Sequence, residues 1–223
     1  MRWRHAWVLV GLLTGMPTCV AGQGAGRAWY AGFGGGWLEA RFQPDYITVA
    51  TGERSAFQNR ERGVHLRLVA GRRFPLGERL SLAAQASVEG NRFEWTLTLP
   101  EEPAEFAYSL PWAATVSVLP EVALRGRMRL MGELGGGLGR VRELKTSPVR
   151  SSYDFDAARG LLTAGVGVAV RMGSRVDLSA QYRLLRYARI RYDTQEPDGT
   201  LIEHVTDAPR AEGLTVVLAR RFF

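Results

Sequence analysis

The side chains best suited to chemistry in this sequence are its histidines, because imidazole titrates near neutral pH and can act as a base. The three are His5, His65 and His204. His65 could combine with Ser87 and Glu39 into a serine–histidine–carboxylate triad, which would activate the hydroxyl for acyl transfer. His204 follows Glu203 in a polar stretch. Separate hydrogen-bonding roles explain these histidines better than a triad does, so we assign no catalytic residue.

Metal and cofactor chemistry finds even less support in the residue types. The only cysteine is Cys19, and no two histidines stand at a spacing that suits a shared metal ion. An acidic cluster of Glu101, Glu102 and Glu105 could attract a cation, but a solvated loop face explains it better. The glycine run 34–36 precedes no predicted helix and lacks the Lys and Ser/Thr of a phosphate-binding loop. We therefore predict no metal site and no cofactor.

The first 21 residues have the features of a secretory signal. Two arginines among the first four residues precede an apolar run over residues 6–13, and small residues at 19–21 suit cleavage. Cleavage after Ala21 would remove 2 of 29 Lys+Arg, leaving 27 against 22 Asp+Glu and lowering the formal net charge from +7 to +5. Acylation of Cys19 is the alternative, but the preceding residues fit it poorly. We predict a signal peptide over residues 1–21 and one domain over 22–223.

Composition narrows the class of protein. A chain of 223 residues with 46% hydrophobic residues is long enough for one folded domain, and it is neither disordered nor built on disulfides. No apolar run after the signal is long enough for a spanning helix. The basic residues are scattered, and an exported protein rarely meets nucleic acid, so we predict no nucleic-acid partner.

Apolar and polar residues alternate along most of the mature chain, with a period of two that is typical of strands. The clearest segments are 64–71, 80–89, 112–119, 162–171 and 176–184, and weaker ones are 29–37, 130–138 and 214–222. No convincing helical spacing follows the signal. The pattern predicts eight strands, an even number.

The predicted connections also alternate, between short and long. Those at 73–79, 123–127 and 172–175 are short, whereas those at 43–62, 91–111, 142–159 and 188–211 run to about twenty residues. Brief periplasmic turns and long outside loops are what a transmembrane β-barrel requires. The sequence thus predicts an all-β fold, an eight-stranded antiparallel up-and-down transmembrane β-barrel.

Alternation alone does not decide which face lies inside, because a soluble barrel would show the same pattern with its apolar face inward. The charges of the polar face favour a polar interior, and they are Arg67, Glu89, Glu121, Arg129, Glu133, Arg171, Asp177 and Arg183. Two further features favour the membrane. The chain ends in Phe222-Phe223, and Trp29, Trp37 and Trp112 stand near strand ends, where tryptophan prefers a bilayer interface.

Several soft motifs carry a family resemblance. They are residues 29–37 (WYAGFGGGW), 115–120 (TVSVLP), 132–139 (GELGGGLG), 181–183 (QYR) and 220–223 (RRFF). Together they resemble the small outer-membrane β-barrel family that includes the OmpA transmembrane domain, OmpX and the opacity-type surface proteins. The ending departs from the family pattern, since Arg221 stands where Tyr is common, and this leaves the register of the last strand open.

The resemblance implies a monomeric, non-enzymatic protein of the bacterial outer membrane that serves envelope integrity or surface contact. Its implied partners are outer-membrane lipid and the barrel assembly machinery, which would engage the C-terminal strand. Aromatic and charged residues in the long connections could bind an extracellular ligand, among them Tyr46, Phe57, Trp95, Tyr108, Tyr153 and Tyr192. Two alternatives stay open: a lipid A-modifying barrel enzyme, and a soluble exported ligand-binding barrel.

The predicted interior balances its charges. Five arginines (67, 129, 171, 183 and 221) face Glu89, Glu121, Glu133 and Asp177, and glycine-rich strands opposite them leave space for long side chains. Eight strands enclose room only for their own side chains. We therefore predict a structural plug rather than an ion path.

Overall fold

The computed structural model describes residues 28–56, 58–92, 95–98, 105–124, 126–146, 153–195 and 200–222. The predicted signal, Glu101, Glu102, Phe57 and Phe223 lie outside these residues. In the described part of the chain, no helix is long and apolar enough to cross a bilayer.

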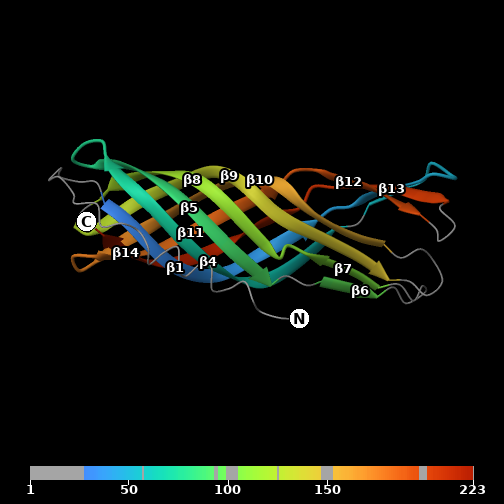
Figure 1. Cartoon of the computed structure of the whole chain (residues 1–223), viewed down its shortest axis with the longest axis horizontal. Helices are drawn as coiled ribbons and strands as arrows, with labels where there is room; N and C mark the ends of the chain where they lie inside the picture. The colour runs from blue at the N-terminus through green and yellow to red at the C-terminus, as the bar shows by residue number, and fades with distance from the viewer. Residues whose placement is uncertain are drawn as a thin grey trace.

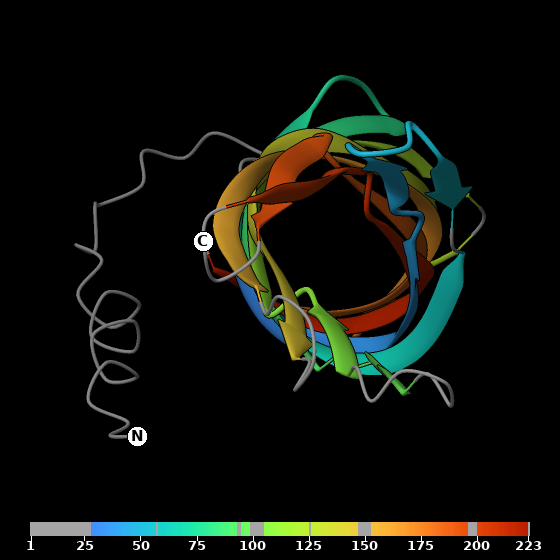
Figure 2. The ribbon, with the colours of Figure 1, turned by 90° about the vertical axis from the view of Figure 1, so that its right-hand side faces the viewer.

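Eight long strands close into a barrel (Figures 1 and 2). They are β1 (Ala28–Phe42), β4 (Asn59–Pro75), β5 (Leu80–Arg92), β8 (Trp112–Ala123), β9 (Met128–Thr146), β10 (Tyr153–Met172), β11 (Val176–Tyr187) and β14 (Arg210–Phe222). Each strand pairs antiparallel with the next, and β1 pairs with β14 from Trp29 opposite Phe222 to Arg41 opposite Arg210. The predicted eight-stranded up-and-down barrel is confirmed.

Side-chain burial is inverted relative to a soluble barrel. Leu66 is 76% exposed, whereas its neighbour Arg67 is 1% exposed. The same contrast holds around the ring, where the outward residues include Phe33, Trp37, Leu68, Val116, Leu134, Leu138, Leu162, Val166, Val216 and Phe222. The apolar faces of the alternating segments point outward and the charged faces point inward, which contradicts the alternative of a soluble barrel with an apolar interior.

The short connections lie together at one end of the barrel, here called the short-turn end, where β14 also finishes (Figure 1). Gly126 and Gly173 occupy left-handed backbone conformations there, with φ of 72° and 73°, which glycine adopts without steric cost. The last strand places Phe222 outward and Arg221 inward, opposite Tyr30 of β1. This resolves the register that the sequence left open.

At the other end, the long connections are largely strands and not loops. β2 (Asp45–Thr48), β3 (Arg54–Ala56), β12 (Ile190–Gln195) and β13 (Leu201–Asp207) form a four-stranded sheet. β6 (Trp95–Thr98) and β7 (Glu105–Ser109) form a hairpin that pairs with β9. β9 and β10 themselves run far beyond their predicted ends. We call this region the outer extension; it projects to the right in Figure 1.

The seam between β1 and β14 depends on glycines that face the interior. A Cβ at Gly36 would lie 1.9 Å from the carbonyl oxygen of Leu214, and one at Gly34 would lie 2.0 Å from that of Val216. Backbone atoms of a paired strand cannot move aside without breaking the ladder. These glycines therefore permit the close approach of the two strands that complete the ring.

We expect Gly36→Ala to impair barrel closure, since the added methyl would overlap the β14 backbone. The measurement is the yield of the folded, heat-modifiable band on gels, where a closed barrel migrates differently before and after boiling. Gly90→Ala is the matched control, because a Cβ at Gly90 meets nothing within 4 Å. Equal yields of the folded band from both variants would contradict the close-approach argument.

Candidate functional site

The middle of the barrel is filled by a layer of two arginines and two glutamates. Arg67 donates to Glu133 (2.8 Å), and Arg183 donates to Glu133 (3.1 Å) and to Glu89 (2.9 Å). The four side chains come from β4, β5, β9 and β11, and all are buried. Two positive and two negative charges cancel, as a buried cluster requires.

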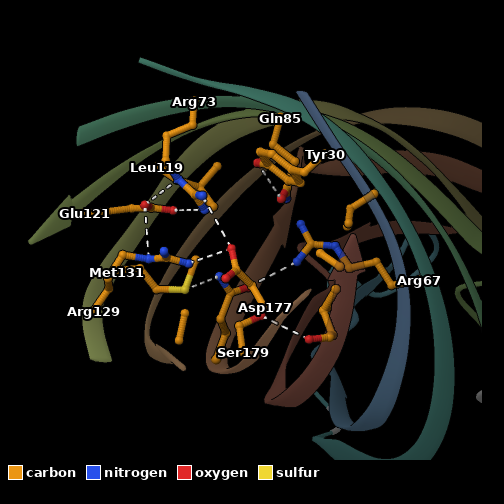
Figure 3. Close-up of a pocket in the computed structure, with 15 residues that line it drawn as sticks. Tyr30, Arg67, Arg73, Gln85, Leu119, Glu121, Arg129, Met131, Asp177 and Ser179 are labelled. Carbon is orange, nitrogen blue, oxygen red and sulfur yellow. Dashed lines mark hydrogen bonds and ion pairs between the residues drawn. The ribbon is translucent and has the colours of Figure 1, made fainter. Parts of the chain in front are cut away.

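A second charged layer lies toward the short-turn end (Figure 3). Arg73 pairs with Glu121 at 2.7 Å, and Arg129 pairs with Asp177 at 2.8 Å. Arg221 approaches Asp177 at 3.6 Å. The two ion pairs of Arg73 and Arg129, together with Tyr30, Gln85 and Met131, line a cavity of about 30 Å³, room for a few waters at most.

The predicted set of interior charges holds, with one exception. Arg171 is exposed at the end of β10, so its assignment to the interior is wrong. Arg73 takes part instead, although the sequence places it at the start of a turn. By strand alternation both residues belong to the inward face, which we call inward parity. However, β4 continues to Pro75 and holds Arg73 over the lumen, whereas β10 ends one residue after Arg171.

Glycine-lined strands accommodate the long polar side chains. A Cβ at Gly165 would lie 3.2 Å from Cγ of Arg183, and one at Gly167 would lie 2.7 Å from Cγ of Gln181. The predicted size complementarity is therefore present here, but between neighbouring strands, β10 and β11, rather than between strands opposite one another.

An apolar cluster closes the barrel above the middle layer. It consists of Leu38, Ala40, Phe42, Tyr108, Leu110, Ala113, Val141, Leu161, Leu185, Tyr187, Ile190 and Ala211. Phe42 and Tyr108 have ring centroids 5.1 Å apart, and the hydroxyls of Tyr108 and Tyr46 are 2.7 Å apart. We call this cluster the apolar cap. The aromatic residues that the sequence assigned to ligand-binding loops at positions 46 and 108 therefore pack inside the outer extension.

Two buried carboxyl groups face one another beside the apolar cap. Glu143 of β9 hydrogen bonds with Asp207 of β13 and accepts a hydrogen bond from the hydroxyl of Tyr192. Asp207 accepts hydrogen bonds from the backbone N–H groups of Gln43 (2.9 Å) and Ala208 (2.6 Å). Burial, with the nearby Asp207 carboxylate as the second cause, raises the pKa of Glu143 from 4.5 to about 8. Burial also raises the pKa of Asp207, so the pair keeps a proton at neutral pH.

The raised pKa predicts that the outer extension loses stability as the pH rises. An unfolded Glu143 ionises near pH 4.5, whereas the folded one keeps its proton to about pH 8, so stability is full below 4.5 and falls across this window. We expect Glu143→Gln to flatten this pH dependence, because the amide keeps both hydrogen bonds without a charge. Urea unfolding between pH 5 and 9, followed by the fluorescence of the intact protein, measures it. A parallel fall in both proteins would contradict the prediction.

The candidate triad of His65, Ser87 and Glu39 does not form. His65 faces inward, with Nε2 3.0 Å from the Thr215 hydroxyl, while Ser87 contacts the Thr115 hydroxyl at 2.7 Å. Glu39 is on the outward face of β1 and pairs with Arg41 at 3.0 Å. The wall of the barrel separates the carboxylate from the histidine, a consequence of strand parity.

The remaining candidates of the sequence also have positions in the structure. His204 pairs through Nδ1 with Asp193 of the neighbouring strand at 2.7 Å, and both are exposed. Among the described residues, no three His, Cys, Asp or Glu side chains gather in a way that could hold a metal ion. Of the acidic cluster, only the backbone of Glu105 is described, at the start of β7.

Comparison with known proteins relates this geometry to the outer membrane. The outer membrane protease OmpT from Escherichia coli superposes with a TM-score of 0.53 at 8% sequence identity, over 87% of this chain and 97% of OmpT. The fold is that of an outer-membrane β-barrel. Ail of Yersinia pestis (12% identity, 87% of this chain, 99% of Ail) and Neisserial surface protein A (16%, 88% and 99%) also match, each with a TM-score of 0.41. No protein-family model matches the sequence, and no curated protein does.

Proposed function

We propose that this protein is an integral protein of the bacterial outer membrane, with the short-turn end in the periplasm and the outer extension outside the cell. The belt of exposed apolar side chains around a charged interior carries this proposal. Such a belt would be a large aggregation-prone surface in water and is stable against lipid hydrocarbon. Trp29 and Trp37, at opposite ends of the belt on β1, are 48% and 60% exposed, which suits rings at the two bilayer interfaces.

We further propose a non-enzymatic role in envelope integrity or surface contact, in which the outer extension presents a rigid surface to an extracellular ligand. The buried polar groups of the interior support this role, because the four charges of the middle layer are paired with one another. These ion pairs stabilise one closed state of the barrel and are not arranged to activate a nucleophile. The protein would act as a monomer, and we assign it no nucleic-acid partner.

Two measurements test these proposals. The protein should stay in the outer-membrane fraction through a salt wash and leave it only with detergent; release by salt alone would refute the membrane location. Lipid A mass spectra from cells with and without expression should be the same. A new acylated or deacylated species would establish the alternative of a lipid A-modifying enzyme.

The proposed partner for assembly is the barrel assembly machinery, which would engage the C-terminal strand. We expect deletion of Phe223 to reduce the yield of folded, heat-modifiable protein, because β14 must pair with β1 to complete the ring. The measurement is the rate at which the folded, heat-modifiable band appears in cells, and its final amount. A truncated chain that assembles at the normal rate would argue against recognition of the terminal aromatic residue.

A further inference from the structure

Strand register assembles a row of four arginines on the outward face of the barrel. Arg186 of β11 is opposite Arg210 of β14, Arg210 is opposite Arg41 of β1, and Arg41 is opposite Arg60 of β4. All four have outward parity. Neighbouring strands are about 4.8 Å apart, so the row spans about 14 Å. We call it the arginine row.

Like charges directly opposite one another in a sheet are destabilising, so an unbroken row over four strands calls for an anion. The protein itself supplies only part of the negative charge that would balance the row. Arg41 binds Glu39 and Glu212, which lie one outward position nearer the belt, and Glu39 also meets Arg62 at 3.5 Å. The patch therefore holds five arginines against two glutamates, a net charge of +3.

The three members of the row other than Arg41 lack a close acidic partner. In the described part of the chain, no ion pair involves Arg60, Arg186 or Arg210, and Nε of Arg210 is buried without a hydrogen-bond partner. A ligand with negatively charged oxygens would satisfy the unpaired nitrogens, and guanidinium groups bind phosphate particularly well.

The position of the row indicates which anion. Two outward positions nearer the short-turn end, the same four strands present Tyr182, Leu214, Trp37 and Val64 side by side, a continuous apolar row. Arg41 is four residues beyond Trp37, about 13 Å along the strand, or roughly 10 Å along the membrane normal at the usual tilt. The headgroup layer is about 5 to 8 Å thick on each side of the hydrocarbon, so the backbone of the row lies just beyond it and the long arginine side chains can reach back to the headgroups.

We propose that the arginine row is a binding site for a phosphorylated lipid of the outer leaflet, with the acyl chains against the Trp37 row and the phosphate groups on Arg60, Arg186 and Arg210. This inference rests on the proposed membrane location. A soluble polyanion would use the charges of the row but gain nothing from the apolar row beneath it, so the continuity of the two rows favours a lipid.

The test uses the full mature protein in detergent and measures binding of bis-phosphorylated lipid A by native mass spectrometry. We expect Arg186→Gln combined with Arg210→Gln to weaken binding about 25-fold, since each arginine near an anionic surface contributes about fivefold. Arg140→Gln with Arg142→Gln is the matched control. Both are outward arginines of β9 that already pair with Asp156 and Asp154, so their loss should leave lipid A binding unchanged.

Further measurements distinguish phosphate carried by a lipid from phosphate of a soluble polyanion, and test whether the row is destabilising without its ligand. Dephosphorylated lipid A should bind the wild type as weakly as lipid A binds the row variant, and inorganic polyphosphate should compete poorly. The lipid-free row variant should melt at a higher temperature than the wild type, because charge repulsion is relieved. Equal lipid A binding by row and control variants, phosphate-independent binding, or stronger binding of polyphosphate would each overturn the proposal. Because these assays are made in detergent, their failure is distinguishable from failure of the membrane fractionation.

Discussion

Replacing Arg183 with alanine is expected to lower the free energy of unfolding of the barrel by about 3 to 5 kcal/mol, the usual cost of leaving a buried charge without its partner. Arg183 is fully buried and is the ion-pair partner of Glu89, at 2.9 Å, as well as one of two partners of Glu133. Without it, the layer holds two carboxylates and one guanidinium in a space that water enters poorly. Urea unfolding of the purified, refolded variants measures the loss.

Two controls separate the loss of a charge partner from the loss of side-chain volume. Arg171→Ala removes an inward-parity arginine that is exposed, so it should change stability by no more than about 0.5 kcal/mol. The double variant Arg183→Ala, Glu89→Gln removes the stranded charge and should recover part of the loss. A single variant as stable as Arg171→Ala would mean that water already solvates the middle layer.

The interior network was predictable because strand parity is readable in the sequence. Arg67 alternates with Val64, Leu66 and Leu68, so once the apolar face is assigned to lipid, the arginine must point inward. What parity does not give is where a strand stops. Arg73 and Arg171 have the same inward parity, and only the lengths of β4 and β10 decide that one is buried and the other exposed.

The outer extension was mispredicted as loops for a related reason. Beyond the belt both faces of the wall meet water or the protein, so the outward positions become charged and the apolar–polar contrast that identifies a lipid-facing strand disappears. Arg140 and Arg142 of β9 form ion pairs with Asp156 and Asp154 of β10, cross-strand contacts that stabilise the ladder. In the sequence these four charges look like a polar loop.

The inward face of the same region carried a signal that long-range pairing obscured. Tyr108, Val141, Tyr187 and Ile190 all enter the apolar cap, but they come from segments up to 82 positions apart in the sequence. Which aromatic residues meet in a core depends on strand register, and the register of β7 on β9 or of β12 on β13 is not encoded in a local pattern. The sequence could supply candidates for the cap without showing that they meet.

We expect the wild-type protein to form no steady open channel in a planar bilayer. Two different barriers lie in series along the lumen: the apolar cap, which is built of buried apolar and aromatic side chains, and the middle layer, whose guanidinium and carboxylate groups pair with one another. The cavity toward the short-turn end, about 30 Å³, is too small to be a conduit. A general porin in the same bilayer is the positive control.

Because the barriers are in series, opening one should not be sufficient. Leu38→Ala with Tyr187→Ala should thin the apolar cap, yet the middle layer would still block ions; Arg183→Ala with Glu89→Gln should loosen the middle layer beneath an intact cap. We expect conductance steps only when all four changes are combined and the folded band is retained. Porin-like steps from the wild type would refute the plug. Steps from either double variant would instead identify the layer that variant alters as the single barrier, because an ion that passes once that layer is opened was never stopped by the other.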